Sequence, residues 1–328
     1  MRWKIGITIE PHAGYKMDAL CELISRKGFE PVYCGPSDGT VGAIERLSKY
    51  EALIAGGDTY SQNILRSLKE KGKIKIIARF GVGYDKIDMD EASRLGIAIT
   101  NTTGTMSKPV AEMTLSLLLS AARFIEYFDR KLRDGVWVTG PIGYSLEGKT
   151  IGIIGFGAIA RQFVEYIKGF NCTILAYDSF FDEAAAKKLN VKYADLDMIA
   201  RESDFISFHL PKTPETVNIW NKKNFVKMKP TSVLINTSRG GIVNEKDLIW
   251  ALENKVIGAA GIDVFEIEPL PHDNPLLKLD NVVMAPHAAA WNEVTELLTG
   301  GRALDNIIDL YEGRIPRNIV NPDYAKNL

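Results

Sequence analysis

Short apolar runs alternate with segments of helical period along most of the chain. The runs are rich in Ile, Val and Leu, and examples are Lys4–Ile9, Ala52–Ala55, Ile74–Ala78, Ile97–Thr100, Ile151–Ile154, Thr173–Tyr177, Asp204–Phe208 and Val233–Asn236. Buried parallel strands are typically continuous apolar runs joined by helical crossovers, so the pattern predicts parallel sheets covered by helices on both faces. The predicted fold class is α/β.

Two series of strands are separated by a stretch with the period of one long helix, about Ser107–Leu132. A further helical stretch, Asn292–Tyr311, follows the second series, and we expect it to return to the first domain. The pattern thus predicts a discontinuous first domain, residues 1–106 and 288–328. A second doubly wound domain, residues 107–287, is inserted between the two helices.

Length and composition are those of an ordinary globular protein. At roughly 150 residues per domain, 328 residues suffice for two domains. The 46% hydrophobic and 25% charged content excludes a disordered chain. Since 40 basic residues stand against 41 acidic ones, the chain lacks the basic excess of a nucleic-acid-binding protein. We expect no nucleic-acid partner.

Nothing in the sequence predicts a membrane or an export route. The longest apolar stretch, Met113–Ala122, is half of what a bilayer span needs. The first residues lack the features of a secretory signal, so we expect a cytoplasmic protein. Cys21, Cys34 and Cys172 are widely spaced, which predicts reduced thiols and neither a disulfide nor a metal site.

A glycine motif opens the second series of strands. Residues 150–160 are a buried strand that leads into Gly-x-Gly-x-x-Ala. Gly155 permits the tight turn, Gly157 lets the backbone approach a pyrophosphate, and Ala160 lets the following helix pack closely. The amides of Ala158 and Ile159, at the helix start, then face the phosphates. The motif predicts a dinucleotide site, although a strand-to-helix turn also carries glycines for structural reasons.

An acidic residue at the next strand supports the dinucleotide interpretation. Asp178 directly follows the run Thr173–Tyr177. It lies 21 residues after Gly157, the separation expected for a carboxylate that binds the adenosine ribose. Ser179 and the two phenylalanines that follow offer no guanidinium for a 2′-phosphate. The sequence therefore favours NAD over NADP.

The four histidines differ in context. His12 and His272 lie in loops with Pro or Gly, and we expect both to be solvated. His209 follows a buried strand, where it can line a cofactor site without reacting. His287 also follows a strand, at the sheet edge where ligands collect. Position alone leaves His287 open between a structural and a catalytic role.

Ordered motifs over nearly the whole chain resemble those of the D-isomer-specific 2-hydroxyacid dehydrogenases. This family includes D-3-phosphoglycerate, D-lactate and glyoxylate/hydroxypyruvate dehydrogenases. The matching segments are Gly152–Ala160 with Asp178, His209–Thr213, Met228–Pro230, Asn236–Gly241, Gly261–Pro269, Pro286 with His287, Arg79–Asp88 and Val110–Glu112. The resemblance implies an NAD-binding Rossmann domain inserted into a flavodoxin-like substrate domain. It also implies hydride transfer between NAD(H) and a small D-2-hydroxy acid or 2-oxo acid.

The resemblance implies a catalytic triad of Arg239, Glu268 and His287. Arg239 would bind the substrate carboxylate and carbonyl with its fixed fork of donors. His287 would deliver a proton to the developing alkoxide. Glu268 would orient the imidazole and favour its charged form. Glu266 competes for this role, but the family pattern places the glutamate directly before proline, hence Glu268.

Further contacts follow from the resemblance. The backbone of Gly81, Val82 and Gly83 would bind the substrate carboxylate. A simple turn at the end of a strand is the alternative for these glycines. Residues implied at the cofactor cleft are Pro211, Thr237, Ser238 and Asp263, of which Asp263 would contact the nicotinamide carboxamide.

Two expectations concern partners. The resemblance implies a homodimer assembled around the long helix Ser107–Leu132, which is apolar on more than one face. A corepressor branch of the same family makes an NAD-sensing binding protein the alternative to an enzyme. Turnover of a 2-oxo acid distinguishes the two functions.

The loop Ala55–Ser61 bears on the substrate. In the family this loop faces the distal end of the substrate, and here it contains Asp58 and has no basic residue before Arg66. A carboxylate repels a phosphate dianion. We therefore expect glyoxylate, hydroxypyruvate or pyruvate to be better substrates than phosphohydroxypyruvate, unless Lys108 or Arg79 supplies the missing charge.

Overall fold

The computed structural model describes residues 2–9, 17–37 and 39–327. The chain divides into two compact units, and the first of them is discontinuous in sequence. The units comprise Met1–Met106 with Trp291–Leu328, and Ser107–Ala290. The second crossing between them therefore falls slightly after the predicted boundary at residue 288. His12, expected to be a solvated loop residue, lies outside the described residues.

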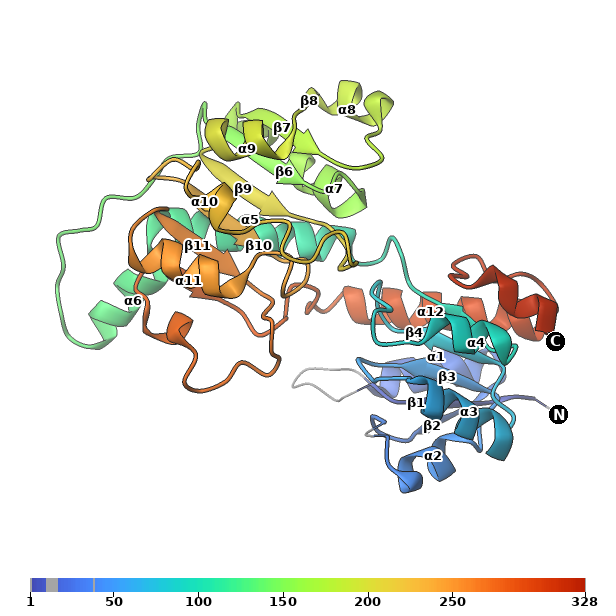
Figure 1. The fold of residues 1–328 in the computed structure, drawn as a ribbon. Coiled ribbons are helices and arrows are strands. Elements are labelled where there is room, and N and C mark those ends of the chain that lie inside the picture. The colour runs from blue at the N-terminus through green and yellow to red at the C-terminus, as the bar shows by residue number, and fades with distance from the viewer. Residues whose placement is uncertain (1, 10–16, 38, 328) are drawn as a thin grey trace. The chain divides into compact units, whose positions relative to one another are not determined.

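The first unit contains a five-stranded parallel sheet in the order β2-β1-β3-β4-β5 (Figure 1). Its elements are β1 (Lys4–Ile7), α1 (Met17–Arg26), β2 (Glu30–Tyr33), α2 (Val41–Leu47), β3 (Ala52–Ala55), α3 (Gln62–Lys71), β4 (Ile76–Arg79), α4 (Met89–Arg94), β5 (Ala98–Thr100), α12 (Thr295–Tyr311) and the 3₁₀ helix η3 (Pro322–Asn327). The chain order reverses between β1 and β3, which is where open α/β sheets form a ligand crevice.

Alternation along the strands gives this sheet two buried faces. Ile54 packs in one core with α1 and α12, whereas its neighbour Leu53 packs in a second core with α2, α3 and α4. Ile76 and Ile77 divide between the same two cores. Because successive side chains of a strand point to opposite faces, a strand covered on both sides must be apolar throughout.

The second unit contains a seven-stranded parallel sheet in the order β12-β11-β10-β9-β6-β7-β8. Its elements are α5 (Ser107–Arg123), α6 (Ile125–Arg133), β6 (Thr150–Ile154), α7 (Ala158–Ile167), η1 (Lys168–Phe170), β7 (Thr173–Tyr177), α8 (Glu183–Leu189), β8 (Val191–Tyr193), α9 (Leu196–Glu202), β9 (Phe205–Phe208), α10 (Lys222–Phe225), β10 (Val233–Asn236), α11 (Glu245–Glu253), β11 (Ala259–Ile262), η2 (Pro275–Lys278) and β12 (Val282–Met284). Residues of α5 and α7 belong to one of its cores, and residues of α9, α10 and α11 belong to the other.

The prediction of one long helix over Ser107–Leu132 is wrong. The helix ends at Arg123, because Phe124 adopts the left-handed conformation with φ 53° and α6 begins at Ile125. The Phe124 side chain is buried in the core that α5 covers, whereas α6 has no buried residue. Packing of one aromatic side chain thus turns the chain at a position where helical periodicity continues.

The predicted fold class is confirmed, since both sheets are parallel and lie between helices. The predicted strands agree with the observed ones to within two residues at each end. The last helix begins at Thr295 instead of Asn292, because the Asn292 side chain accepts hydrogen bonds from the backbone of Val294 and Thr295 and so precedes the first turn.

Candidate active site

The glycine motif forms the corner between β6 and α7. Gly155 has φ +94°, and a Cβ there would lie 2.8 Å from the backbone of His209, so only glycine fits. Gly157 is the N-cap of α7 and makes no side-chain cap. A Cβ at Gly157 would meet no atom within 4 Å. The open space therefore lies over the first turn of α7, where Ala158 and Ile159 present helix-start amides.

Asp178 lies against the same corner. Its Oδ2 accepts a hydrogen bond of 2.7 Å from the backbone of Phe156, and its Oδ1 accepts one of 2.9 Å from Phe180. Each carboxylate oxygen can accept a second bond, so both keep capacity for a hydroxyl donor. The sheet order explains the proximity, because β6 and β7 are adjacent.

The ends of β9 and β10 place further predicted residues. Burial lowers the pKa of His209 to about 3, so its imidazole is neutral, and Nε2 lies 2.9 Å from Ser207 Oγ. Thr237 is buried with its hydroxyl 2.8 Å from that of Thr114. Ser238 donates to Asn236 Oδ1 from both its amide and its hydroxyl. Pro211 follows His209 and is exposed.

These features fit a bound dinucleotide. The glycine corner leaves room beside helix-start amides, which suits a pyrophosphate, and Asp178 keeps acceptor capacity for ribose hydroxyls. The contacts of Pro211, Thr237 and Ser238 with the cofactor stay predictions.

Arg239, Glu268 and His287 follow three adjacent strands. They come after β10, β11 and β12, which are neighbours in the sheet, so parallel pairing brings their loops to one edge. Asn236 shapes the first loop: its Nδ2 donates 3.1 Å to the carbonyl of Arg239, which closes the turn. Residues 48 positions apart in sequence, Arg239 and His287, thereby share an edge.

His287 and Glu268 form a hydrogen-bonded pair. His287 Nδ1 lies 2.8 Å from Glu268 Oε2, and Glu268 Oε1 accepts a bond of 3.0 Å from the backbone of Phe265. Since the carboxylate is the acceptor, Nδ1 carries the proton and Nε2 is the nitrogen left for proton exchange. The side chains are 48% and 35% exposed, so a small molecule can reach them.

Asp263 holds the backbone of the histidine segment. It is fully buried, and its oxygens accept from the amides of Ala288 (2.8 Å) and Ala289 (3.0 Å), while its carbonyl accepts from His287. Burial raises the pKa of Asp263 to about 6, and the two amide bonds oppose the rise. His287 has φ 55°, a strained conformation that these bonds maintain. Contact of Asp263 with a nicotinamide stays a prediction.

In the first unit, the Gly81–Gly83 turn follows β4. Gly81 has φ +147°, and its amide donates 3.0 Å to the hydroxyl of Thr102. Val82 offers its carbonyl to Asn101. The Gly81 amide is thus already engaged, so a substrate carboxylate would depend mainly on the amides of Val82 and Gly83.

Asp58 is less accessible than the sequence suggests. It is 8% exposed, and its Oδ2 accepts from the hydroxyls of Thr8 and Tyr60, the latter at 3.1 Å. Burial raises the pKa of Asp58, and the hydroxyl of Thr8 and the charge of Arg79 act in the opposite direction. The carboxylate therefore fastens the loops after β1 and β3 to each other.

Known proteins share this architecture. A family model described as "D-isomer specific 2-hydroxyacid dehydrogenase, NAD binding domain" matches residues 115–289. The glyoxylate reductase of Korarchaeum cryptofilum is 42% identical over 289 residues, covering 86% of each chain. The chain belongs to the D-isomer specific 2-hydroxyacid dehydrogenase family.

Other relatives in the family carry different names. A D-3-phosphoglycerate dehydrogenase of Archaeoglobus fulgidus is 38% identical over 85% of this chain but only 53% of its own length. The apo-structure of D-lactate dehydrogenase from Escherichia coli superposes with a TM-score of 0.83 at 30% identity, over 97% of this chain and 99% of the other.

Family membership confirms the predicted reaction class and cofactor. The chain is an NAD-dependent oxidoreductase of 2-hydroxy and 2-oxo acids, and residues 115–289 are its NAD-binding domain. Within the residues that the structure describes, no helix combines the length and apolar character of a membrane span. The same residues contain no group of three or more His, Cys, Asp or Glu arranged to hold a metal ion.

The sequence pattern did not reveal one guanidinium that lies beside the predicted site for the adenosine of NAD. Arg161, in the first turns of α7, reaches the loop after β7 and lies 3.0 Å from Asp182. Its Nε donates 3.0 Å to the carbonyl of Phe156. The expectation about a 2′-phosphate rests on the residues directly after Asp178. Nothing in the sequence pattern links position 161 to position 182.

Proposed function

We propose that this dehydrogenase reduces small unphosphorylated 2-oxo acids, with glyoxylate and hydroxypyruvate as the leading substrates. The observation that carries the proposal is the 2.8 Å pair of His287 and Glu268 on the same sheet edge as Arg239. Bound NADH supplies the hydride for the carbonyl carbon. The relative with 42% identity is named a glyoxylate reductase, which supports this substrate class.

Each residue of the triad has a distinct task in the proposal. Arg239 binds the substrate carboxylate and carbonyl through its fork of charged donors, because a guanidinium keeps its charge at all working pH values. His287 gives its Nε2 proton to the oxygen as the hydride arrives, and takes it back in the reverse reaction. Glu268 fixes the ring orientation through Nδ1 and stabilises the imidazolium.

The first unit is proposed to be the substrate domain. The amides of Val82 and Gly83 would bind the substrate carboxylate, since a glycine turn allows close approach of the backbone. Asp58 disfavours a distal phosphate, because two like charges at close range repel by a few kcal/mol at an effective dielectric constant of about 20.

A panel of 2-oxo acids tests the substrate. We expect loss of NADH absorbance with glyoxylate and hydroxypyruvate, and a lower kcat/KM with phosphohydroxypyruvate than with hydroxypyruvate. A higher kcat/KM for the phosphorylated compound would contradict the role of Asp58. No turnover with any 2-oxo acid would favour the NAD-sensing alternative, for which we find no specific support.

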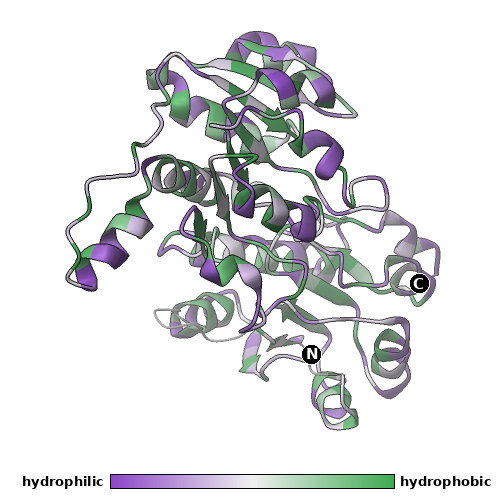
Figure 2. Ribbon diagram, turned by 60° about the vertical axis from the view of Figure 1, so that its left-hand side comes forward, coloured by the Kyte–Doolittle hydropathy of each residue, from purple (hydrophilic) through white to green (hydrophobic). Residues whose placement is uncertain are grey.

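We propose that the chain forms a homodimer. The proposed contact lies in α6 and the chain after it, and not in α5. Leu117 and Leu118 of α5 are buried within their own unit, whereas α6 has no buried residue and the chain after it loops away from the sheet (Figures 1 and 2). This segment exposes Trp137 by 85% and Ile142 by 90%. A second copy of this chain would cover these side chains.

Light scattering at micromolar concentration tests the dimer. Wild-type protein should have twice the chain mass, and Trp137→Glu should shift it toward the monomer because a buried charge is costly. Ile315→Glu, at a 79% exposed apolar residue of the first unit, is the matched control and should remain dimeric. A monomeric wild type would contradict the proposal.

We propose a cytoplasmic location. Cys21, Cys34 and Cys172 are all free thiols, as expected in a reducing compartment. Fractionation of cells with an antibody to this chain tests the location, and recovery outside the cytoplasm would contradict it.

A further inference from the structure

The loop that carries Glu268 is held at two points by one carboxylate from another element. The loop runs from the end of β11 to η2 without regular structure. Glu245 Oε2 accepts a hydrogen bond of 3.0 Å from the amide of Glu266, and Glu245 Oε1 accepts one of 2.8 Å from Asn274 Nδ2. These two bonds, here called the Glu245 bridge, flank Glu268. Irregular loops are mobile unless their backbone is tied, so the bridge restricts this one.

Glu245 itself is fixed by a helix. It is the first residue of α11, whose N-cap Asn244 accepts 2.9 Å from the amide of Asp247. The amide of Glu245, which has no partner within the helix, donates 2.9 Å to Glu266 Oε1. The helix dipole favours carboxylates at this end. The bridge thus joins the loop to a regular element packed on the sheet.

The amide that Glu245 holds is adjacent in the chain to the amide that contacts Glu268. The amide of Phe265 donates 3.0 Å to Glu268 Oε1, and the following amide, of Glu266, is the one that Glu245 holds. Gly240, directly after Arg239, abuts the same stretch: a Cβ there would lie 1.7 Å from the carbonyl oxygen of Phe265. The loops of Arg239 and Glu268 therefore meet where the bridge acts.

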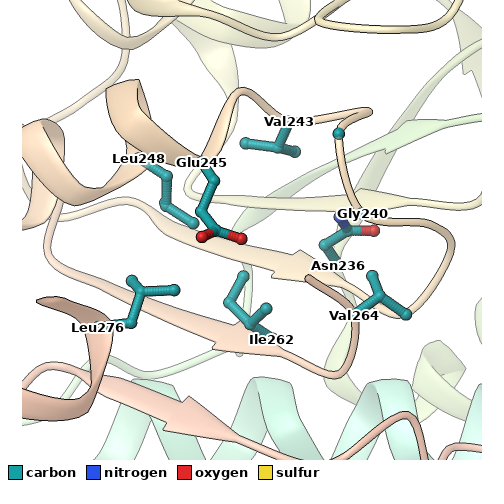
Figure 3. A pocket seen from close by; sticks show the side chains of 9 residues that line it. Asn236, Gly240, Val243, Glu245, Leu248, Ile262, Val264 and Leu276 are labelled. Atoms are coloured by element: carbon teal, nitrogen blue, oxygen red, sulfur yellow. The ribbon is translucent and has the colours of Figure 1, made fainter. Parts of the chain in front are cut away.

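The Glu245 carboxylate borders a small cavity between α11 and the loop after β11. Figure 3 shows this carboxylate directed into a cavity of about 10 Å³, space for about one water molecule. The lining side chains are largely apolar, among them Val243, Leu248, Ile262 and Leu276. Removing the carboxylate would leave the Glu266 amide and the Asn274 amide group without their acceptor, and the loop would lose its two ties together.

We propose that Glu245 is a positioning residue for the reaction: by holding residues 266 and 274 to α11, it keeps Glu268 aligned with His287 Nδ1. The inference rests on the proposed role of Glu268 as the partner of the acid–base histidine. A mere helix cap would affect stability alone. A positioning residue must also alter the pH dependence of turnover.

Glu245→Ala tests the inference, with Glu183→Ala as the matched control. Glu183 is the first residue of α8, follows an N-cap aspartate whose side chain accepts from the third helical amide, and is exposed. We expect kcat of Glu245→Ala to fall about tenfold, less than the 10²–10⁴-fold of a lost acid–base group because the pair is loosened and not removed. The pH midpoint of kcat/KM should fall, as it should in Glu268→Gln, because a loosened or missing carboxylate stabilises the charged imidazole less. The Kd for NADH, measured by fluorescence, should not change in Glu245→Ala. The control Glu183→Ala should keep the kcat, the pH midpoint and the Kd of the wild type.

Conservative variants and a double mutant separate positioning from folding. Glu245→Gln keeps one acceptor oxygen and should show an intermediate shift. If Glu245→Ala does not fold, Asn274→Ala removes one tie and should show a smaller shift in the same direction. Adding Glu245→Ala to Glu268→Gln should cause little further loss, because both act through one hydrogen bond.

Two results would overturn the inference. An unshifted pH profile in Glu245→Ala, with additive losses in the double mutant, would make Glu245 a helix cap only. An unshifted profile in Glu268→Gln would instead remove Glu268 from the mechanism, and the inference with it. The two failures are distinguishable because the second is measured in Glu268→Gln alone, with Glu245 unchanged.

Discussion

Asp58 of the first unit and the Glu268–His287 pair of the second unit both follow strands of their sheets, but they differ in exposure and in hydrogen-bond partners. In the second unit, Glu268 and His287 bond to each other and remain 35% and 48% exposed. In the first unit, Asp58 is 8% exposed and its carboxylate is bonded by hydroxyls from two loops. Both units have parallel sheets between helices, so the architecture does not account for the difference.

The contrast shows what makes a charge at a strand end reactive. A carboxylate whose oxygens are taken up by neighbouring loops stabilises those loops, whereas one that shares an accessible edge with a histidine can support proton transfer. The buried carboxylate of Asp58 therefore stabilises its loops, whereas the accessible pair of Glu268 and His287 is placed for proton transfer.

The largest effect is expected at the accessible histidine. His287→Ala should lower kcat by about 10²–10⁴-fold, since that is what a positioned acid–base group contributes. His272→Ala, at an exposed loop histidine of the same unit, is the control and should retain full kcat. Near-normal turnover of His287→Ala would remove this residue from the mechanism.

Arg239 should rank second. Arg239→Ala should lower kcat/KM for the best 2-oxo acid by roughly 10²-fold, because hydrogen bonds to charged groups are worth about 1.5–3 kcal/mol each. Arg239→Lys should recover only part, because an ammonium lacks the planar fork. Full recovery with lysine would show that a point charge is sufficient.

The cofactor preference should show a smaller effect. NADP would bring its phosphate against Asp178, and Arg161 is already paired with Asp182, so kcat/KM should be at least about tenfold higher with NADH than with NADPH. Asp178→Asn should narrow that ratio. Equal efficiency of the wild type with both cofactors would refute the assignment of Asp178.

Asp58→Asn tests whether the charge of the buried carboxylate also affects the choice between phosphorylated and unphosphorylated substrates. If its charge reaches the pocket, the ratio of kcat/KM for phosphohydroxypyruvate over hydroxypyruvate should rise by roughly two- to tenfold. Asp90→Asn, at an exposed aspartate of the same unit, is the control. An unchanged ratio would restrict Asp58 to a structural role and sharpen the contrast between the units.

The smallest effect on turnover is expected at Glu91. The guanidinium groups of Arg94 and Arg66 lower the pKa of this carboxyl to about 2. A lowered pKa in the folded state adds stability above the unfolded value of about 4.5, and this stability is lost as the pH falls toward 2. Glu91→Gln should therefore lower Tm at pH 7, and the difference from wild type should shrink at pH 3.

Turnover at 25 °C should not change in Glu91→Gln, since the partners of this carboxylate, Gln62, Arg66 and Arg94, are not among the predicted site residues. Thermal unfolding at the two pH values provides the measurement. An equal Tm difference at pH 7 and pH 3 would mean that the ion pairs do not carry the effect.

The α/β class and the glycine corner follow from patterns that are visible in the amino-acid sequence alone. Apolar runs such as Ile151–Ile154 must be buried on both faces, and the spacing of Gly155, Gly157 and Asp178 reflects local geometry that the covalent chain imposes. The family resemblance added the triad residues, which no spacing rule identifies because residues 239, 268 and 287 are far apart in the chain.

Features that depend on partners distant in sequence could not be predicted and are visible only in the folded chain. The break at Phe124 arises from burial of its ring, although the helical pattern continues. The state of Asp58 depends on a hydroxyl 50 residues away, and the bridge at Glu245 depends on amides of the loop after β11. Local sequence fixes which groups a residue carries, whereas burial and the choice of hydrogen-bond partner are set by packing between elements.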